Sequence, residues 1–150
     1  MNYSCKGSVL LVGIGGYGGT YVKALRPAME EGRLSIAALV DPMGDKAPDG
    51  PELAQRGIPR YDNLDEALKD GRRADLVVIS PPIALHASQS RAALAAGLPV
   101  LCEKPAAATL KEVDAMTAAA RAAHQSLAIG FQWSYSDAIL ALKTDLMAGR

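Results

Sequence analysis

The sequence predicts an α/β protein with a doubly wound parallel β-sheet, arranged as three α/β/α layers. Three observations lead to this prediction. Apolar segments alternate with helix-like segments along the chain, as in successive βαβ units. The first strand, Ser8–Val12, is almost continuously apolar, which is typical of parallel strands buried on both faces. It runs directly into a glycine cluster that a helix follows. Right-handed crossovers between such elements build a sheet with helices on both faces.

The stretch Val9–Gly19 (VLLVGIGGYGG) contains a candidate dinucleotide-binding turn. Three glycines have the spacing G-x-G-x-x-G: Gly13, Gly15 and Gly18. The first allows a sharp turn, the second lets a pyrophosphate approach the backbone, and the third lets the helix pack closely. The N–H groups around Gly16 and Tyr17 then face the anion at the helix N-terminus. The alternative is a glycine-rich turn without a ligand.

The first helix is expected over Tyr17–Glu31. Pro27 interrupts this segment, and an interior proline removes a helical hydrogen bond. We therefore expect a kink or an early end near Arg26.

Asp41 ends the second expected strand, Leu34–Val40, and lies 23 residues after Gly18. In dinucleotide sites an acidic residue at about this distance hydrogen-bonds a ribose. A carboxylate there accepts from both hydroxyls of the adenosine ribose and repels a 2′-phosphate, so the sequence favours NAD over NADP. The alternative is an ordinary aspartate in a turn with Pro42.

The remaining elements continue the alternation. A loop is expected over Pro42–Gly57, with one helical turn at Glu52–Arg56. Strands are expected at Ile58–Tyr61, Asp75–Ser80, Leu98–Cys102 and Leu127–Gly130. Helices are expected at Leu64–Lys69, capped by Asn63 or Asp62; at Ala84–Ala96, stopped by Gly97; from the capping box of Thr109 and Glu112 to Ala123; and from Ser136 or Asp137 to Ala148. The last helix has Ile139, Leu142 and Leu146 on one face. In an open sheet, ligands bind beyond the carboxyl ends of the strands, where Gly13, Asp41, Ser80 and Glu103 are expected.

Length and composition suit one domain spanning 1–150. The formal net charge is +0, which argues against a nucleic-acid partner. No apolar run reaches the about 20 residues of a membrane span, and the N-terminus does not resemble a signal peptide. Cys5 and Cys102 form no disulfide framework, and Cys102 is expected to be a buried apolar residue. We therefore expect a cytoplasmic protein without a metal site.

The sequence resembles the Gfo/Idh/MocA family, named for glucose–fructose oxidoreductase, inositol dehydrogenase and a rhizopine catabolism protein. The resemblance spans essentially the whole chain. Four stretches carry it: Val12–Gly19, the turn at Asp41, Ser80–Pro105 and Ile129–Ile139. The third is the most specific, because it joins a helix ending in A-A-G to a short strand and then E-K-P.

This resemblance implies a Rossmann fold and an oxidoreductase that transfers a hydride between NAD and a secondary alcohol of a sugar or cyclitol. It implies that the nicotinamide half is bordered by Ser80, Pro81, Pro82 and, near the same edge, His86. It also implies that Glu103 hydrogen-bonds the nicotinamide ribose and that Lys104 is catalytic, facing the substrate oxygen. A lysine ammonium there stabilises developing negative charge.

Alternatives remain for several of these residues. Lys104 is also compatible with a solvated lysine at a strand end, and Glu103 with a role only as its salt-bridge partner. His86 is compatible with a capping or packing role. Trp133 and Tyr135 either pack against the cofactor or fill the sheet edge, whereas His124 is expected at the surface.

Two departures from the family pattern matter. Ser134 stands where many relatives carry an arginine, which puts any cofactor contact of that arginine in doubt. Relatives also continue into a second α/β domain that supplies most substrate contacts and often the oligomer interface. We therefore expect a cofactor domain that binds NAD(H) but turns over poorly alone, from a homo-oligomeric parent enzyme. The alternatives are an NAD-dependent glycosidase of the same family and a stand-alone NAD-sensing or regulatory module.

Overall fold

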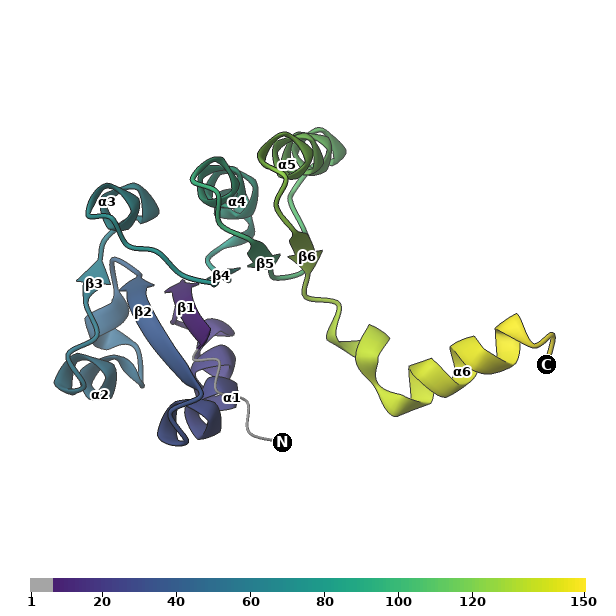
Figure 1. Ribbon diagram of the computed structural model, residues 1–150, viewed down its shortest axis with the longest axis horizontal. Coiled ribbons are helices and arrows are strands. Elements are labelled where there is room, and N and C mark those ends of the chain that lie inside the picture. Colours follow the sequence, from purple (N-terminus) through teal and green to yellow (C-terminus); the bar gives the residue numbers. More distant parts are fainter. Residues whose placement is uncertain (1–6) are drawn as a thin grey trace.

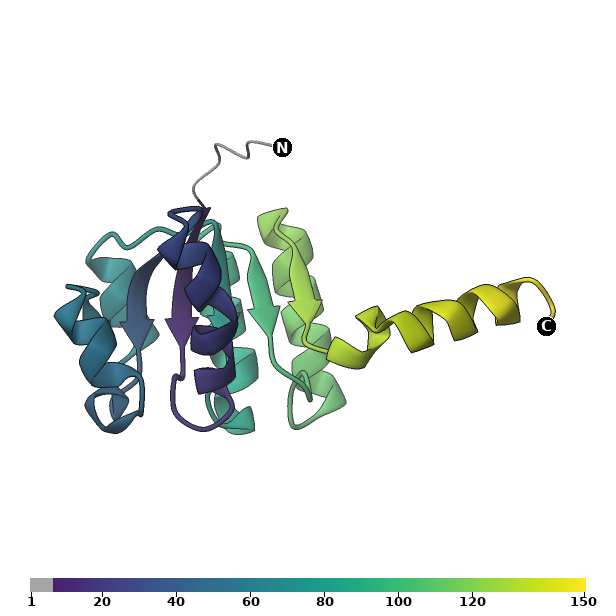
Figure 2. The same ribbon diagram turned by 90° about the horizontal axis from the view of Figure 1, so that it is seen from below.

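In the computed structural model, which describes residues 7–150, six parallel strands form one sheet in the order β3-β2-β1-β4-β5-β6 (Figure 1). The strands are β1 (Gly7–Val12), β2 (Leu34–Val40), β3 (Arg60–Tyr61), β4 (Leu76–Ile79), β5 (Val100–Cys102) and β6 (Leu127–Ile129). The strand arrows that can be seen in Figure 2 all point the same way. The doubly wound parallel sheet predicted from the sequence is confirmed. The expectation for Cys5 concerns a residue outside the described range.

Helices cover both faces of this sheet, as Figure 1 shows. The helices are α1 (Gly18–Glu30), α2 (Gly50–Gln55), α3 (Leu64–Lys69), α4 (His86–Ala95), α5 (Leu110–Ala123) and α6 (Asp137–Met147), with short 3-10 turns η1 (Gly44–Lys46), η2 (Ile83–Leu85) and η3 (Gln132–Tyr135). Helices α3, α4 and α5 lie on one face, and α1 and α2 lie on the other. The strand order reverses between β1 and β4, which is where such folds bind ligands.

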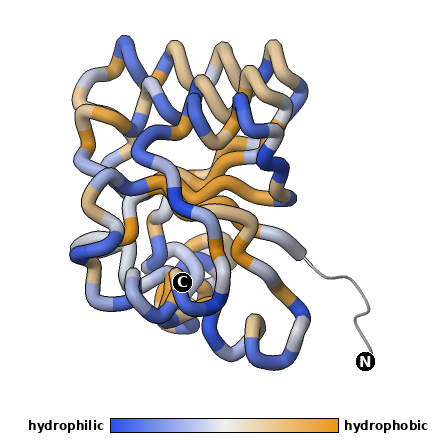
Figure 3. Tube along the Cα trace, turned by 90° about the vertical axis from the view of Figure 1, so that its left-hand side faces the viewer, coloured by the Kyte–Doolittle hydropathy of each residue, from blue (hydrophilic) through white to orange (hydrophobic). Residues whose placement is uncertain are grey.

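The core consists of two layers, because successive side chains of a strand point to opposite faces. In β1, Leu10 and Val12 pack toward α3, α4 and α5, whereas Val9 and Leu11 pack toward α1 and α2. Cys102 belongs to the first layer and is fully buried, as expected, and burial raises the pKa of its thiol to about 11. Figure 3 shows the hydrophobic strands between the helix layers.

Helix α1 does not end early at Pro27, and this expectation was wrong. The helix continues to Glu30 with the proline inside it. The carbonyl that loses its partner belongs to Lys23, four residues earlier. Lys23 is exposed, so water can solvate that carbonyl.

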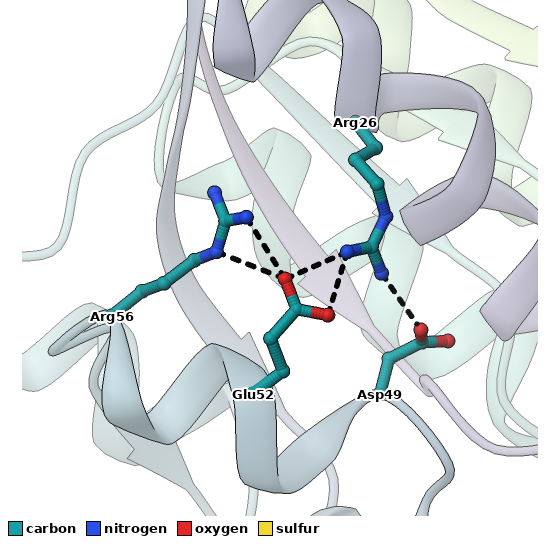
Figure 4. Close-up of polar contacts among 4 residues, drawn as sticks. All are labelled: Arg26, Asp49, Glu52 and Arg56. Atoms are coloured by element: carbon teal, nitrogen blue, oxygen red, sulfur yellow. Dashed lines mark hydrogen bonds and ion pairs between the residues drawn. The ribbon is translucent and has the colours of Figure 1, made fainter.

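The segment after β2 is more helical than the sequence suggested. Instead of one turn at Glu52–Arg56, it contains η1 and a helix α2 that begins at Gly50. Arg26 of α1 contacts two acidic residues of this segment, Asp49 at 3.0 Å and Glu52 at 2.6 Å (Figure 4). Hydrogen bonding to Arg26 lowers the pKa of Glu52. These ion pairs fasten the connection between β2 and β3 to α1.

The expected helix caps are present. The Asn63 side chain accepts from the Glu66 N–H at 3.0 Å, and Thr109 and Glu112 form the reciprocal capping box of α5. Gly97 follows α4 with φ of 77°, the left-handed conformation that glycine supplies after a helix.

Helix α6 projects from the rest of the fold, and its main contacts are with η3 (Figure 2). It begins at Asp137, and the Ser136 hydroxyl caps it, in agreement with the sequence. Its apolar residues are not covered: Ile139 is 41%, Leu142 53% and Leu146 66% exposed. In Figure 1 no helix of the described residues lies beneath β5 and β6 on the side of α1.

Candidate functional site

The glycine turn between β1 and α1 is tightly packed against neighbouring backbone. Gly13 has φ of +77°, and a Cβ there would lie 2.6 Å from the Pro81 nitrogen. A Cβ on Gly18 would lie 1.9 Å from the Gly13 carbonyl oxygen. Gly15 differs, because a Cβ there would meet only the Asp41 carboxylate, at 3.9 Å. The turn and close-packing roles expected of Gly13 and Gly18 therefore match the geometry, and the backbone at Gly15 is open to a ligand.

The Asp41 carboxylate connects the end of β2 to this turn. Its Oδ2 accepts hydrogen bonds from the N–H groups of Ile14 at 2.9 Å and Gly15 at 3.2 Å. Its Oδ1 accepts from the Met43 N–H at 2.8 Å. The side chain is thus fixed beside the glycine turn, with both acceptor sites of Oδ2 used and one site left on Oδ1.

A pocket of about 790 Å³ lies at the carboxyl ends of β1, β2 and β4. Eight of the sequence-predicted residues line it: Gly13, Gly15, Gly16, Tyr17, Asp41, Ser80, Pro81 and Pro82. Gln89 of α4 also lines it, and the amide oxygen of this side chain is buried without a hydrogen-bond partner. An unpaired buried acceptor is costly, so it marks a place for a donor from a ligand. The open glycine backbone, the fixed carboxylate and this acceptor together fit a dinucleotide.

A smaller pocket of about 190 Å³ shares Tyr17, Ser80 and Pro81 with the first. The other predicted residues line it: His86, Glu103 and Lys104. Gly18 alone among the predicted residues lines neither pocket, because it is buried under the turn. The two pockets adjoin at Tyr17, Ser80 and Pro81, where the strand order reverses, and together they are called the groove.

His86 is a buried bridge between the two turns that border the smaller pocket. It is 3% exposed. Its Nδ1 lies 2.9 Å from the Pro105 carbonyl oxygen, and its Nε2 lies 3.0 Å from the Pro81 carbonyl oxygen. Both ring nitrogens therefore face the protein backbone.

Glu103 is buried at the end of β5, with only 6% of its surface exposed. Its Oε1 accepts from the Tyr21 hydroxyl at 2.6 Å, and its Oε2 accepts from the Lys104 N–H at 3.0 Å. Among residues 7–150 no ion pair involves Glu103. The alternative that Glu103 serves only as the salt-bridge partner of Lys104 therefore does not agree with the structure.

Lys104 follows Glu103 and is exposed. Its Nζ lies 5.7 Å from the centroid of the Tyr17 ring, within cation–π range. The Tyr17 hydroxyl in turn hydrogen-bonds the Gln132 side chain of η3. The glycine turn thus supplies the aromatic surface against which the lysine lies.

The aromatic residues after β6 do not reach the glycine pocket. Trp133 is 73% and Tyr135 75% exposed. Both line a third pocket of about 580 Å³ between α1, β6 and η3, which also includes Tyr21 and shares Tyr17 and Glu103 with the smaller pocket. Neither residue is part of the core. His124 is exposed after α5, as expected.

Sequence reasoning missed several residues in or beside the groove. The clearest is Tyr21, which lies four residues after Tyr17 and therefore on the same face of α1. That spacing was the available signal, but its partner Glu103 is 82 residues away in the chain. Met43 and Gln89 were missed for the same reason, since neither belongs to a local motif.

Within 7–150, no helix is both long and apolar enough to cross a membrane. The same range contains no group of three or more His, Cys, Asp or Glu side chains arranged to hold a metal ion.

Comparison with known proteins identifies relatives. The model of the GFO_IDH_MocA family, described as an oxidoreductase family with an NAD-binding Rossmann fold, matches residues 8–131. The chain is 32% identical over 139 residues to a rhizopine catabolism protein MocA of Rhizobium meliloti, covering 93% of this chain and 42% of that protein. It is 31% identical over 146 residues to an inositol 2-dehydrogenase of Streptomyces avermitilis, covering 95% of this chain and 40% of that protein.

A similar solved structure is that of an NAD-binding oxidoreductase from Klebsiella pneumoniae. It is 30% identical, with a TM-score of 0.79, and the match covers 97% of this chain and 39% of that one. The chain therefore spans about two fifths of the length of the curated relatives that it matches.

Proposed function

Because this chain belongs to the GFO_IDH_MocA oxidoreductase family and has its NAD-binding Rossmann fold, we propose that the groove holds NAD(H) for hydride transfer. The substrate in this proposal is a secondary alcohol of a sugar or cyclitol. One observation carries it: the pocket of about 790 Å³ combines an open glycine turn with the fixed carboxylate of Asp41. Both features meet at the switch point, where open α/β sheets bind nucleotides.

Preference for NAD over NADP is part of this proposal. The Asp41 carboxylate accepts hydrogen bonds from ribose hydroxyls but repels a 2′-phosphate. Arg60 is the nearby cation, since its Nη1 donates to the Asp41 carbonyl oxygen at 3.0 Å. Its guanidinium is already paired with Asp45 at 3.2 Å and Asp62 at 2.5 Å. Both carboxylates therefore compete with a phosphate for this guanidinium.

The smaller pocket is proposed to take the nicotinamide end. Ser80 is fixed there, because its hydroxyl donates to the Gly13 carbonyl oxygen at 2.7 Å. Glu103 offers buried carboxylate acceptors to ribose hydroxyls. Since both nitrogens of His86 face carbonyl oxygens, its part in this proposal is to hold the turns at Pro81 and Pro105 in place.

NAD, when bound, supplies a hydride acceptor at the nicotinamide C4. Lys104 is proposed to lie by the reacting oxygen, where its ammonium stabilises an alkoxide or donates a proton to it. The Tyr17 ring beneath the Lys104 Nζ and the backbone turn after β5 together orient this side chain. An exposed ammonium at the mouth of the smaller pocket suits a substrate that enters from solvent.

The substrate class rests on the names of relatives, which include a rhizopine catabolism protein and an inositol dehydrogenase. A homo-oligomeric parent enzyme and a single domain spanning 1–150 belong to the same proposal. So does a cytoplasmic location, which agrees with Cys102 being a buried free thiol.

Isothermal titration calorimetry of the chain with NADH and NADPH tests the cofactor proposal. We expect NADH to bind at least tenfold more tightly than NADPH. Asp41→Asn removes the charge while preserving the shape, so it should weaken NADH binding by about tenfold or more and abolish the preference. Absence of NADH binding at millimolar concentration would overturn the proposal.

A further inference from the structure

We propose that Tyr21 is a positioning residue that fixes the Glu103 carboxylate for the nicotinamide ribose. This inference rests on the proposed function, in which Glu103 faces that ribose. Helix α1 then has two roles. It follows the glycine turn, and one of its faces orients the Glu103 carboxylate at the nicotinamide end of the groove.

The contacts around Glu103 leave its carboxylate one defined orientation. The Tyr21 hydroxyl donates to Oε1 at 2.6 Å, and the Lys104 N–H donates to Oε2 at 3.0 Å. A carboxylate has about four acceptor sites, so each oxygen keeps capacity for a ligand hydroxyl. Gly130 leaves the necessary room, since a Cβ there would lie 2.8 Å from Oε1 and 3.1 Å from Cδ.

The hydrogen bond from Tyr21 also stabilises the Glu103 carboxylate, which has no ion-pair partner among the described residues. Glu103 is 6% exposed, and a buried carboxylate needs donors to compensate for lost water. Burial raises the pKa of Tyr21 well above its ordinary value, and the Glu103 carboxylate raises it further. The phenol therefore stays protonated and remains a donor at every physiological pH.

Tyr21 is itself held by the glycine turn. Its ring meets that of Tyr17 edge to face, with centroids 6.4 Å apart and planes at 80°. Tyr17 also lies under the ammonium of Lys104. The two tyrosines thus connect α1 to both residues of the E-K pair.

Tyr21→Phe tests this role, because it keeps the ring and removes only the hydroxyl. Two ligands are titrated by calorimetry: NADH, and ADP, which lacks the nicotinamide and its ribose. We expect the Kd for NADH to rise about tenfold and the Kd for ADP to change less than twofold. Tyr61→Phe is the matched control, since Tyr61 donates its hydroxyl to the carboxylate of Asp70 outside the groove, and both affinities should stay unchanged.

A double-mutant cycle tests whether Tyr21 acts through Glu103. In a Glu103→Gln background, Tyr21→Phe should cost less than threefold in NADH affinity. A full tenfold cost there, or an equal loss for ADP and NADH in the single variant, would overturn the positioning role.

Gly130→Ala provides an independent variant that leaves α1 intact. Its added Cβ should displace the carboxylate and weaken NADH binding selectively, and an unchanged NADH affinity would count against the proposal. Asp41→Asn separates the two proposals. If it weakens NADH binding while Tyr21→Phe does not, the cofactor site stands and the role of Tyr21 falls. If it leaves NADH binding unchanged, the proposed function itself fails.

Discussion

The adjacent glycines at the start of α1 allow a sharp test of how the glycine turn is packed. Gly18 and Gly19 are both helical, and each can be changed to alanine. At Gly18 the new Cβ would lie 1.9 Å from the Gly13 carbonyl oxygen and 2.8 Å from the Ser80 hydroxyl oxygen. At Gly19 it would make ordinary contacts, at 3.6 Å from Asp49 and from the Ile14 carbonyl oxygen.

The two substitutions should change the free energy of unfolding in opposite directions. The obstacle at Gly18 is backbone, which cannot turn aside as a flexible side chain can, so the helix must shift away from β1. Overpacking of this kind typically costs about 1–3 kcal/mol, and we expect the upper part of that range. Gly19→Ala instead lowers the entropy of the unfolded chain and should stabilise the fold by about 0.5–1 kcal/mol.

Urea denaturation followed by circular dichroism measures both variants against the parent chain. We expect the free energies of unfolding of the two variants to differ by about 3 kcal/mol, which corresponds to roughly 6–12 °C in Tm for a chain of this size. Gly18→Ala should also weaken NADH binding, because the turn moves with the helix. Melting temperatures within 2 °C of each other would refute the close packing inferred for Gly18.

Three further changes test other contacts. His86→Leu should lower the free energy of unfolding by about 1–3 kcal/mol, because it removes the single N–H that a neutral imidazole donates to one of the two carbonyl oxygens, and urea denaturation measures this loss. Thr109→Ala should cost about 1 kcal/mol by removing the capping box with Glu112, seen as a lower Tm. Hydrogen bonds from Ser8 lower the pKa of Asp75 below its ordinary 3.8, so its stabilisation is present above about pH 4 and is lost as the pH falls through the lowered pKa. Asp75→Asn should therefore show a shallower loss of stability on acidification below pH 5, and an identical pH profile would contradict this.

Features encoded by neighbouring residues could be predicted from the sequence. Apolar runs located the strands, and the glycine spacing located the turn, because each depends on backbone conformation and burial over a few residues. Asp41 could be predicted from its distance to the turn, although its hydrogen bonds to Ile14 and Gly15 could not.

What the sequence missed depends on solvent or on distant partners. Pro27 was expected to kink α1 or end it early near Arg26, but the helix continues because the lost hydrogen bond falls on an exposed turn. The helix α2 begins earlier than expected, where Arg26 of another helix holds Asp49 and Glu52. No role was predicted for Tyr21, because its partner Glu103 is distant in the sequence and lies beside it only in the folded sheet.

The strand order has a consequence for synthesis of the chain. β1 is made first but pairs with β4, and the contact between Ser8 and Asp75 spans 67 residues. At about 5–20 residues per second, a ribosome needs about 3–13 s to make that interval. During this time β2 can pair with one edge of β1 while the other edge remains open to foreign strands. A nascent chain paused before β4 should therefore be the species most in need of a chaperone.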